Sequence, residues 1–212
     1  MGRVNSTDRR ARLVRHLERS GIRDRRVLDA IGRVPRERFI PVELEAEAYE
    51  DRALPIGDGQ TISQPYVVAR MTELLDPRPG DHVLDVGGGS GYQAAVLAEL
   101  AGDVVSVERQ PALAAAEATR LQGLGYVNVR VVQGDASTGF ADAAPYDKIL
   151  VAAASPALHR ELIEQCSPTG RIVAPVGPRD LQTLTVRHGD GRIERAGAVG
   201  FVPLLGEGGF TE

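Results

Sequence analysis

The chain has 212 residues, of which 42% are hydrophobic and only 4% are aromatic, and it carries 25 Lys and Arg against 29 Asp and Glu. This length fits one large domain, and a mostly aliphatic core is typical of the strands of a parallel sheet. The net charge of −4 gives no electrostatic reason to expect a nucleic acid or an anionic membrane as a partner.

The sequence favours a cytoplasmic location. Cys166 is the single cysteine, which excludes an intrachain disulfide and suits a reducing compartment. It ends an apolar helical run, so we expect it to be a small buried side chain. Residues 1–15 are polar and basic, and no apolar run reaches the roughly 18 residues of a membrane span. We therefore expect neither a signal peptide nor a membrane segment.

The first predicted elements are two helices, over residues 7–20 and 24–33, which Gly21 separates. Both have apolar residues at helical spacing. Basic residues alternate with these apolar positions, which favours a solvated helix face over a binding patch. Pro35 is expected to end the second helix.

The next segment, residues 53–65, contains proline, glycine and polar residues that forbid a regular helix. We do not expect it to be an exposed linker, because Leu54, Ile56 and Ile62 would be buried if it packed on the rest of the chain. A helix with a continuous apolar face is predicted to begin at Pro65.

From residue 82 the sequence alternates predicted strands with predicted helices. Strands are expected over residues 82–86, 104–107, 129–132, 148–151 and 171–175, and helices over 92–100, 111–124 and 156–165. A hairpin over 181–199 adds two antiparallel strands at one edge. The predicted fold class is α/β, with a doubly wound, mostly parallel seven-stranded sheet. Residues 1–50 are predicted to be an N-terminal helical extension packed on a main domain of residues 51–212, in one compact unit.

The stretch from His82 to Tyr92, HVLDVGGGSGY, joins a buried strand to a helix through a glycine-rich turn, as in a nucleotide-binding sheet. The glycines follow a GxGxG spacing. The dinucleotide motif would need glycine where Tyr92 stands, and the turn has no Lys or Arg to face a phosphate. Asp85 precedes the glycines and suits a ligand with an amino group and a positive sulfonium centre. The sequence therefore favours S-adenosylmethionine; a dehydrogenase is the alternative, with Arg109 as the only hint of a 2′-phosphate contact.

Two further acids follow the next two strands. Glu108 stands where a carboxylate can accept hydrogen bonds from both ribose hydroxyls. Asp135 stands where it could accept a hydrogen bond from the adenine amino group. Each acid alone could be a solvated loop residue or a helix cap. Three acids at the ends of three successive strands, Asp85 included, favour one cofactor site.

Several motifs, in a fixed order, resemble those of the protein-L-isoaspartate O-methyltransferase family. The longest is LPIGDGQTISQPY, over residues 54–66. The others are VPRERF (34–39), RMTELL (70–75), APYD (144–147), PVG (175–177) and FVPL (201–204). The resemblance therefore covers nearly the whole chain.

This resemblance implies a Rossmann-like class I methyltransferase fold and an S-adenosylmethionine-dependent protein carboxyl O-methyltransferase, with S-adenosylhomocysteine as a product. Members of the family methylate the free carboxylate of L-isoaspartyl residues, and less readily of D-aspartyl residues, in damaged proteins and peptides. The ester collapses to a succinimide, whose hydrolysis returns some normal aspartate, so the reaction is protein repair. The implied partners are proteins and peptides that contain isoaspartyl residues. No metal site is predicted, and a monomer is the default expectation.

By the same resemblance, Ser63 is the active-site serine, with its hydroxyl near the incoming carboxylate. The alternative is that Ser63 only caps the helix that starts near Pro65. The implied cofactor-binding residues are Thr61, Ile62, Ser63, Asp85, Gly87, Gly89, Gly91, Glu108, Gly134 and Asp135. The implied peptide-binding residues are Ile56, Ser63, Val202 and Pro203.

Three positions depart from the family pattern. Many relatives have Gly-Thr-Gly or Gly-Ser-Gly in the turn, where this chain has Gly88 in the middle. The lost hydroxyl and the added backbone freedom predict a looser cofactor loop. Ala152 replaces a frequent threonine, and Gly200 replaces the arginine that bacterial relatives often carry before the FVPL run. These two changes fall on the acceptor side and bear on substrate preference.

Two other functions stay open at this point. A family paralogue could methylate one specific aspartate in a biosynthetic peptide, and a cofactor-binding module could have lost catalysis and serve as an adaptor. Ser63 and the three acids argue against the adaptor. A methyltransferase for small molecules fits less well, because the glycine-rich tail from Gly206 to Phe210 suits an extended peptide better than an enclosed pocket.

Overall fold

The computed structural model describes residues 5–211, so residues 1–4 of the predicted extension and residue 212 of the predicted main domain lie outside the described residues. The helices are α1 (Ser6–Arg19), α2 (Arg25–Arg33), α3 (Pro65–Leu75), α4 (Tyr92–Ala98), α5 (Pro111–Gly123) and α6 (Arg160–Gln165). The strands are β1 (Leu54–Gly57), β2 (Gln60–Ile62), β3 (His82–Val86), β4 (Asp103–Glu108), β5 (Val129–Gln133), β6 (Tyr146–Val151), β7 (Cys166–Val176), β8 (Gln182–His188) and β9 (Ile193–Val199). Short 3₁₀ helices are η1 (Arg36–Phe39), η2 (Val42–Glu47), η3 (Ala136–Thr138) and η4 (Ala141–Ala143).

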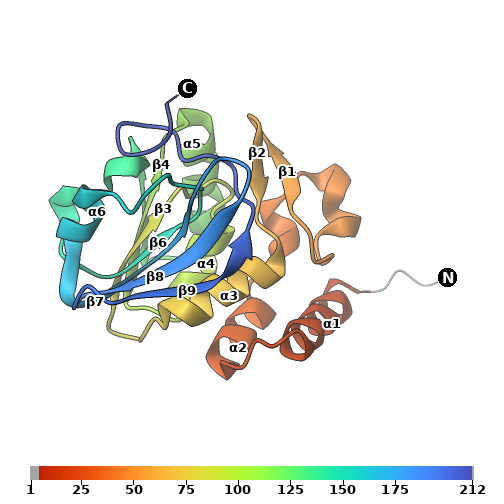
Figure 1. Ribbon diagram of the computed structural model, residues 1–212. Coiled ribbons are helices and arrows are strands. Elements are labelled where there is room, and N and C mark those ends of the chain that lie inside the picture. Colours follow the sequence, from red (N-terminus) through yellow and green to blue (C-terminus); the bar gives the residue numbers. More distant parts are fainter. Residues whose placement is uncertain (1–4, 212) are drawn as a thin grey trace.

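The main sheet has seven strands within the described residues, in the order β5-β4-β3-β6-β7-β8-β9 (Figure 1). Strands β5, β4, β3, β6 and β7 run parallel, and β8 and β9 add antiparallel strands at one edge. The chain proceeds from β3 to β4 and β5, then returns to the other side of β3 with β6. In open α/β sheets, ligands bind beyond the carboxyl ends of the strands at such a reversal. This topology confirms the predicted fold class and places the glycine turn at the reversal point.

The two faces of the sheet are buried under different elements. Val83 of β3 and Leu150 of β6 belong to one apolar cluster, together with residues of helices α1 to α5. Leu84 and Val86, which alternate with Val83 along β3, belong to a second cluster with Leu162 of α6. Both clusters are mostly aliphatic, as the composition predicts. Side-chain alternation along buried parallel strands therefore builds the layered core.

The two N-terminal helices pack beside α3 (Figure 1). Leu17 of α1 and Leu28 of α2 are buried in the same cluster as Val83 of the central strand. Burial of this apolar surface joins the N-terminal residues to the sheet. The side chains of Asn5 and Asp24 accept backbone hydrogen bonds at the starts of α1 and α2, which explains where both helices begin.

One segment is more regular than expected. Residues 54–62 form the hairpin β1–β2 instead of irregular chain, with Gly57 paired to Gln60. Asp58 and Gly59 between them have φ values of 50° and 70°, the conformation of a two-residue hairpin turn. The Asp-Gly pair is the sequence signal for this hairpin, and the strands were too short to show an alternating pattern.

The region before β7 also differs from the prediction. Helix α6 begins at Arg160 and not at residue 156, because the Ser155 hydroxyl donates a hydrogen bond to the Ala157 carbonyl oxygen (2.6 Å) in a local turn that competes with helix. Cys166 is consequently the first residue of β7, and it is half-buried, not the buried end of a helix. No helix in the described part of the chain is long and apolar enough to cross a membrane.

Candidate functional site

Three adjoining cavities lie around the glycine turn, among residues that follow the carboxyl ends of β3, β4, β5 and β6. The outer cavity is lined by Gln60, Gly87, Glu108, Arg109, Gln110, Ala136, Ala153, Pro203, Leu204 and Leu205. The central cavity is lined by Thr61, Ile62, Ser63, Val68, Met71, Gly87, Gly88, Gly89, Ser90, Tyr92, Gln93, Ala152 and Phe201. The wide cavity, of about 410 Å³, is lined by Ala53, Thr61, Ser63, Gln64, Tyr66, Val67, Ala152, Ala198, Val199, Gly200, Phe201 and Val202. Shared lining residues show that the three cavities adjoin one another.

The glycine turn forms the boundary between the outer and central cavities. Gly87, Gly89 and Gly91 have φ values of 91°, 55° and 82°, which residues with a side chain rarely adopt. The backbone N–H groups of Gly87 and Gly88 both donate to the Val107 carbonyl oxygen, at 2.9 and 3.2 Å. The turn is therefore tied to the end of β4, and its bare backbone lets a ligand approach closely.

Glu108 ends β4 and lines the outer cavity with only 7% of its surface exposed. One carboxylate oxygen accepts a hydrogen bond from the Gly89 N–H (2.9 Å), and the other accepts one from the Gln110 N–H (2.8 Å). Each oxygen keeps a further lone pair for another donor. This geometry fits the predicted hydrogen bonds to two ribose hydroxyls.

Asp85 lies beneath the turn and does not line any of the three cavities. Its side chain is fully buried on the sheet face that it shares with Ser106, its partner in the β3–β4 register. Neither carboxylate oxygen has a hydrogen-bond partner. Burial, and to a lesser extent the charge of Glu108, raises the pKa of Asp85 to about 7. The side chain is buried beneath the turn, and its direct contact with a ligand amino group stays a prediction.

Gly134 and Asp135 follow β5 and also lie outside the linings of the three cavities. One Asp135 oxygen accepts hydrogen bonds from the backbone N–H (2.9 Å) and hydroxyl (2.6 Å) of Ser137, and the other accepts one from the Glu207 N–H (2.9 Å). Asp135 therefore anchors the C-terminal segment, whose preceding residues form a wall of the outer cavity. Asp135 Oδ2 keeps a further lone pair, and its contact with an adenine amino group stays a prediction.

Ser63 lines both the central and the wide cavity, at the point where they meet. Its hydroxyl makes no hydrogen bond within residues 5–211, and it does not cap α3. The N-cap residue is Gln64, and the Asp51 carboxylate instead accepts a hydrogen bond from the Tyr66 N–H (2.8 Å) in the first turn. The capping alternative for Ser63 is therefore wrong in this structure, and the hydroxyl is available to a ligand.

A buried arginine fixes the backbone of Ser63. Arg36, in η1, donates hydrogen bonds to the carbonyl oxygens of Ala48 (2.9 Å) and Ser63 (2.8 Å). Its guanidinium carbon lies 4.8 Å from the centroid of the Tyr92 ring, at the start of α4. Burial lowers the pKa of Arg36 below its usual value. No role in the site was predicted for the VPRERF motif, which contains Arg36, and only the folded chain shows this link.

The predicted peptide-binding residues separate into two places. Val202 lines the wide cavity, and Pro203 lines the outer cavity. Ile56 is in neither; its Cδ1 atom would lie 3.6 Å from a Cβ atom at Gly89, so Ile56 packs over the glycine turn. Ala152 and Gly200, the two departures assigned to the acceptor side, both line the wide cavity.

Several lining residues carried no specific sequence signal for a site. Leu204 and Leu205 in the outer cavity and Met71 and Val68 in the central cavity are ordinary apolar residues, which sequence patterns assign to a core. Phe201, Leu204 and Met71 also belong to motifs of the family resemblance, which assigned them no role in the site. Their part in the site depends on tertiary packing alone.

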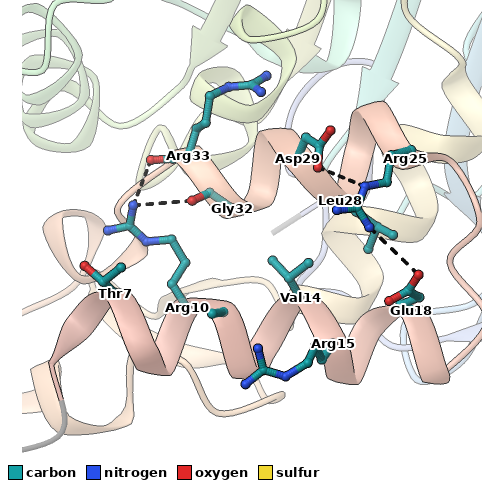
Figure 2. Close-up of a pocket in the computed structure, with 11 residues that line it drawn as sticks. Thr7, Arg10, Val14, Arg15, Glu18, Arg25, Leu28, Asp29, Gly32 and Arg33 are labelled. Atoms are coloured by element: carbon teal, nitrogen blue, oxygen red, sulfur yellow. Dashed lines mark hydrogen bonds and ion pairs between the residues drawn. The ribbon is translucent and has the colours of Figure 1, made fainter.

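A separate groove of about 630 Å³ lies between α1 and α2 (Figure 2). Arg10 in this groove donates to the carbonyl oxygens of Gly32 (3.5 Å) and Arg33 (3.0 Å). Arg25 forms ion pairs with Glu18 and Asp29, and Figure 2 shows both. These internal partners support the interpretation of the basic residues as a solvated helix face. Among the described residues, no three His, Cys, Asp or Glu side chains gather to hold a metal ion.

The residues around the turn fit S-adenosylmethionine. The outer cavity combines apolar walls with the Glu108 carboxylate, which suits an adenosine group. The turn offers bare backbone next to it, and the apolar side chains of Val68 and Met71 line the central cavity beyond. The outer and central cavities have volumes of about 70 and 40 Å³, so it is the chemistry of their lining residues, and not their present size, that matches a ligand with an adenosine end and a small aliphatic end.

The chain matches the family model described as protein-L-isoaspartate(D-aspartate) O-methyltransferase over residues 8–209. It is 53% identical to the protein-L-isoaspartate O-methyltransferase of Aeropyrum pernix over 212 residues, covering 96% of this chain and 82% of that protein. It is 50% identical to the protein of the same name from Methanoregula boonei, covering 97% of this chain and 96% of that protein.

Solved structures agree with these sequence matches. One chain named protein-L-isoaspartate O-methyltransferase superposes with a TM-score of 0.81 at 28% identity, covering 94% of this chain and 66% of that longer chain. A Plasmodium falciparum chain described as an isoaspartate methyltransferase, solved in complex with S-adenosyl-L-homocysteine, has a TM-score of 0.78 at 24% identity and covers 92% of this chain and 98% of that chain. At that identity, the second match shows the fold alone.

Proposed function

The chain belongs to the protein-L-isoaspartate(D-aspartate) O-methyltransferase family, and from this premise we propose how its residues carry out the reaction. The protein is an S-adenosylmethionine-dependent protein repair methyltransferase, whose acceptor is the free carboxylate of an isoaspartyl residue. The observation that carries the proposal is the position of Ser63, in the walls of both the central and the wide cavity.

On the donor side, we assign the outer and central cavities to S-adenosylmethionine, which supplies a methyl group on a sulfonium sulfur. The Glu108 carboxylate would accept hydrogen bonds from the ribose hydroxyls. The backbone at Gly87, Gly89 and Gly91 carries no side chain, so the ligand can approach it closely. Thr61 and Ile62 of β2 cover the central cavity.

Two residues that were predicted to bind the methyl donor act indirectly in this proposal. Asp85 supports the turn from beneath, and Asp135 holds the C-terminal segment that walls the outer cavity. Gly134 belongs with Asp135: its N–H donates to the Glu108 carbonyl oxygen (3.0 Å), which joins the ends of β4 and β5.

On the acceptor side, the wide cavity takes the peptide, with Val202 in its wall. The carboxylate of the substrate has a solution pKa near 4 and is ionised at pH 7, so the reaction needs no general base. The chain instead has to orient the carboxylate and exclude water. The Ser63 hydroxyl donates a hydrogen bond to the carboxylate, and Arg36 holds the Ser63 backbone in place.

We further propose that the protein acts as a cytoplasmic monomer and that residues 1–50 and 51–212 work as one unit. Among residues 5–211 the large exposed apolar residues lie in different parts of the chain, which supports a monomer; they are Val42, Val127, Leu181 and Ile193. Buried contacts of α1 and α2 with α3 support one unit.

The breadth of the substrates is tested with pairs of peptides of several unrelated sequences, each pair differing only in aspartyl or isoaspartyl linkage. With labelled S-adenosylmethionine, general repair predicts transfer to every isoaspartyl member and to no aspartyl member. Transfer to a normal aspartyl residue in one sequence alone would instead support a dedicated biosynthetic peptide. Tight cofactor binding without transfer would support an adaptor.

A further inference from the structure

Glu117, in α5, lies behind the glycine turn and has no part in the function proposed above. Its side chain is fully buried and lines none of the three cavities. One carboxyl oxygen accepts a hydrogen bond from the Ser106 hydroxyl at 2.7 Å, and the other has no partner. A buried carboxyl group with an unpaired oxygen is costly, so its position in the fold needs a reason.

The space that Glu117 fills is the space under Gly88. A Cβ atom at residue 88 would lie 2.2 Å from Glu117 Oε2 and 2.5 Å from Ser106 Oγ, closer than real side chains approach. Gly88 differs from Gly87, Gly89 and Gly91 in that its φ is not positive, so its backbone does not require glycine. Glycine is required at residue 88 because the Glu117 carboxyl and the Ser106 hydroxyl hydrogen-bonded to it occupy the space that a side chain would need.

Helix α5 contacts the turn at a second point. Arg120 Nη1 donates a hydrogen bond to the Ser90 carbonyl oxygen at 2.6 Å. Glu117 and Arg120 are three residues apart and therefore lie on the same face of the helix. The turn is thus held from behind by two side chains of one helix, which opposes the looser cofactor loop that Gly88 alone predicts.

We propose that Glu117 is a positioning residue for the methyl donor: its carboxyl group fills the space under Gly88 and fixes the glycine turn in the shape that S-adenosylmethionine binds. The inference rests on the proposed function in one respect, that this turn holds the donor. Gly88 and Glu117 depend on each other: the carboxyl at 117 leaves no room for a side chain at 88, and the absence of a side chain at 88 leaves room for the carboxyl.

The surroundings of Glu117 favour its neutral form. Burial is the main cause, and the charges of Asp85 on β3 and Glu108 on β4 act in the same direction, against the Ser106 hydrogen bond and the Arg120 charge. Together they raise the pKa of Glu117 to about 8. A neutral carboxyl can lie against backbone without the cost of a buried charge, and an amide of the same shape can replace it.

The test is a double-mutant cycle on the full-length protein, with the affinity for S-adenosylhomocysteine measured by calorimetry. Glu117→Ala is expected to weaken binding about tenfold, and Gly88→Ala to weaken it by a similar factor. In Gly88→Ala/Glu117→Ala the new methyl group occupies the space that Glu117 vacates, and the Ser106 hydroxyl, which has lost its acceptor, can rotate away from it. The double variant is therefore expected to bind within about threefold of wild type. Gln122→Ala, at an exposed position of α5, is the control and should bind normally.

Kinetics separate positioning from a general loss of stability. Glu117→Ala should raise the KM for S-adenosylmethionine about tenfold while kcat changes less than about twofold. Glu117→Gln should bind within about twofold of wild type at pH 7 and should lose less affinity than wild type between pH 7 and pH 9, because the amide cannot ionise. Wild type and Glu117→Gln bind the same ligand, so comparing their affinities at each pH removes the effect of the ligand's own titration.

Wild-type protein that binds no S-adenosylhomocysteine would overturn the proposed function. If wild type binds but Glu117→Ala binds equally well, or if the two alanine substitutions are additive, the proposed role of Glu117 is wrong and the function stands. A lower melting temperature for Glu117→Ala with unchanged affinity and KM would also overturn it.

Discussion

Ser63 is the residue at which the two halves of the site meet. It lies in the wall of the cavity assigned to the donor and in the wall of the cavity assigned to the peptide, and its hydroxyl has no partner among the described residues. A hydrogen bond from this hydroxyl to a carboxylate would be formed only when the acceptor is bound. The residue should therefore affect turnover and not cofactor binding.

Ser63→Ala is expected to lower kcat for an isoaspartyl peptide about 10- to 100-fold, the usual worth of one hydrogen bond to a charged group. Affinity for S-adenosylhomocysteine should stay within about twofold of wild type, as measured by calorimetry. Ser20→Ala, an exposed serine after α1, is the matched control. Wild-type turnover in Ser63→Ala would remove Ser63 from the proposal.

Gly200 offers a residue-level test of substrate preference. It lines the wide cavity, and a Cβ atom built there meets no atom within 4 Å, so a larger side chain has room. Gly200→Arg is expected to lower the KM for an acidic isoaspartyl peptide about threefold, because the added cation attracts it. Gly200→Gln supplies a side chain without the charge and should show no such preference. An equal effect of both variants on acidic and neutral peptides would contradict the electrostatic explanation.

At the scale of elements, η1 connects the N-terminal residues to Ser63. Arg36 is fully buried, donates to two backbone carbonyl oxygens and lies over the Tyr92 ring. The glycine turn leads directly into α4 through Tyr92, so one arginine contacts both the acceptor segment and the helix that follows the donor turn. Its loss should affect both stability and activity.

Arg36→Met is expected to lower the free energy of unfolding by about 3 kcal/mol, because it leaves two buried carbonyl oxygens without a charged donor. Urea unfolding measures this change, and kcat should fall as well, since the Ser63 backbone loses its anchor. Arg38→Met, at an exposed position of the same 3₁₀ helix, should leave both quantities nearly unchanged. Equal midpoints of urea unfolding for Arg36→Met and wild type would contradict the proposed role of Arg36.

The elements also show which features could be predicted from the sequence. Alternating strands and helices predicted the sheet, and the GxGxG spacing and Glu108 predicted a donor site, because these features depend on local pattern. The hairpin at Asp58 and Gly59 was missed because its strands are short. The burial of Asp85, the engagement of Asp135 by the C-terminal segment and the contact of Glu117 with Gly88 join residues far apart in the chain, which no single-sequence pattern reports.

At the scale of the whole molecule, two buried acids make stability depend on pH. Burial, with smaller contributions from neighbouring acids, raises the pKa of Glu117 to about 8 and of Asp85 to about 7. The unfolded chain releases these protons near pH 4, so between about pH 4 and pH 8 the folded state binds more protons. The stability that these groups contribute is complete below pH 4 and is lost as the pH rises through 7 and 8.

We therefore expect the melting temperature of the wild type to fall by about 10 °C between pH 6 and pH 9. Glu117→Gln should fall less over the same range, because one of the two titrating groups is removed. Glu164→Gln, at an exposed site of α6, should follow the wild type. The melting temperatures are measured by calorimetry at each pH. If the melting temperature changes equally with pH in wild type and Glu117→Gln, Glu117 is not protonated in the folded protein.

The proposed function requires that the methyl group goes to the free carboxylate of an isoaspartyl residue. The direct measurement is time-resolved mass spectrometry of one isoaspartyl peptide, also carrying a glutamate and a free C-terminus, incubated with the protein and S-adenosylmethionine. We predict that the first methyl ester appears on the isoaspartyl residue, that it gives way to a succinimide, and that the aspartyl peptide then accumulates. An ester first found on the glutamate, the C-terminus or a normal aspartyl residue would contradict the account.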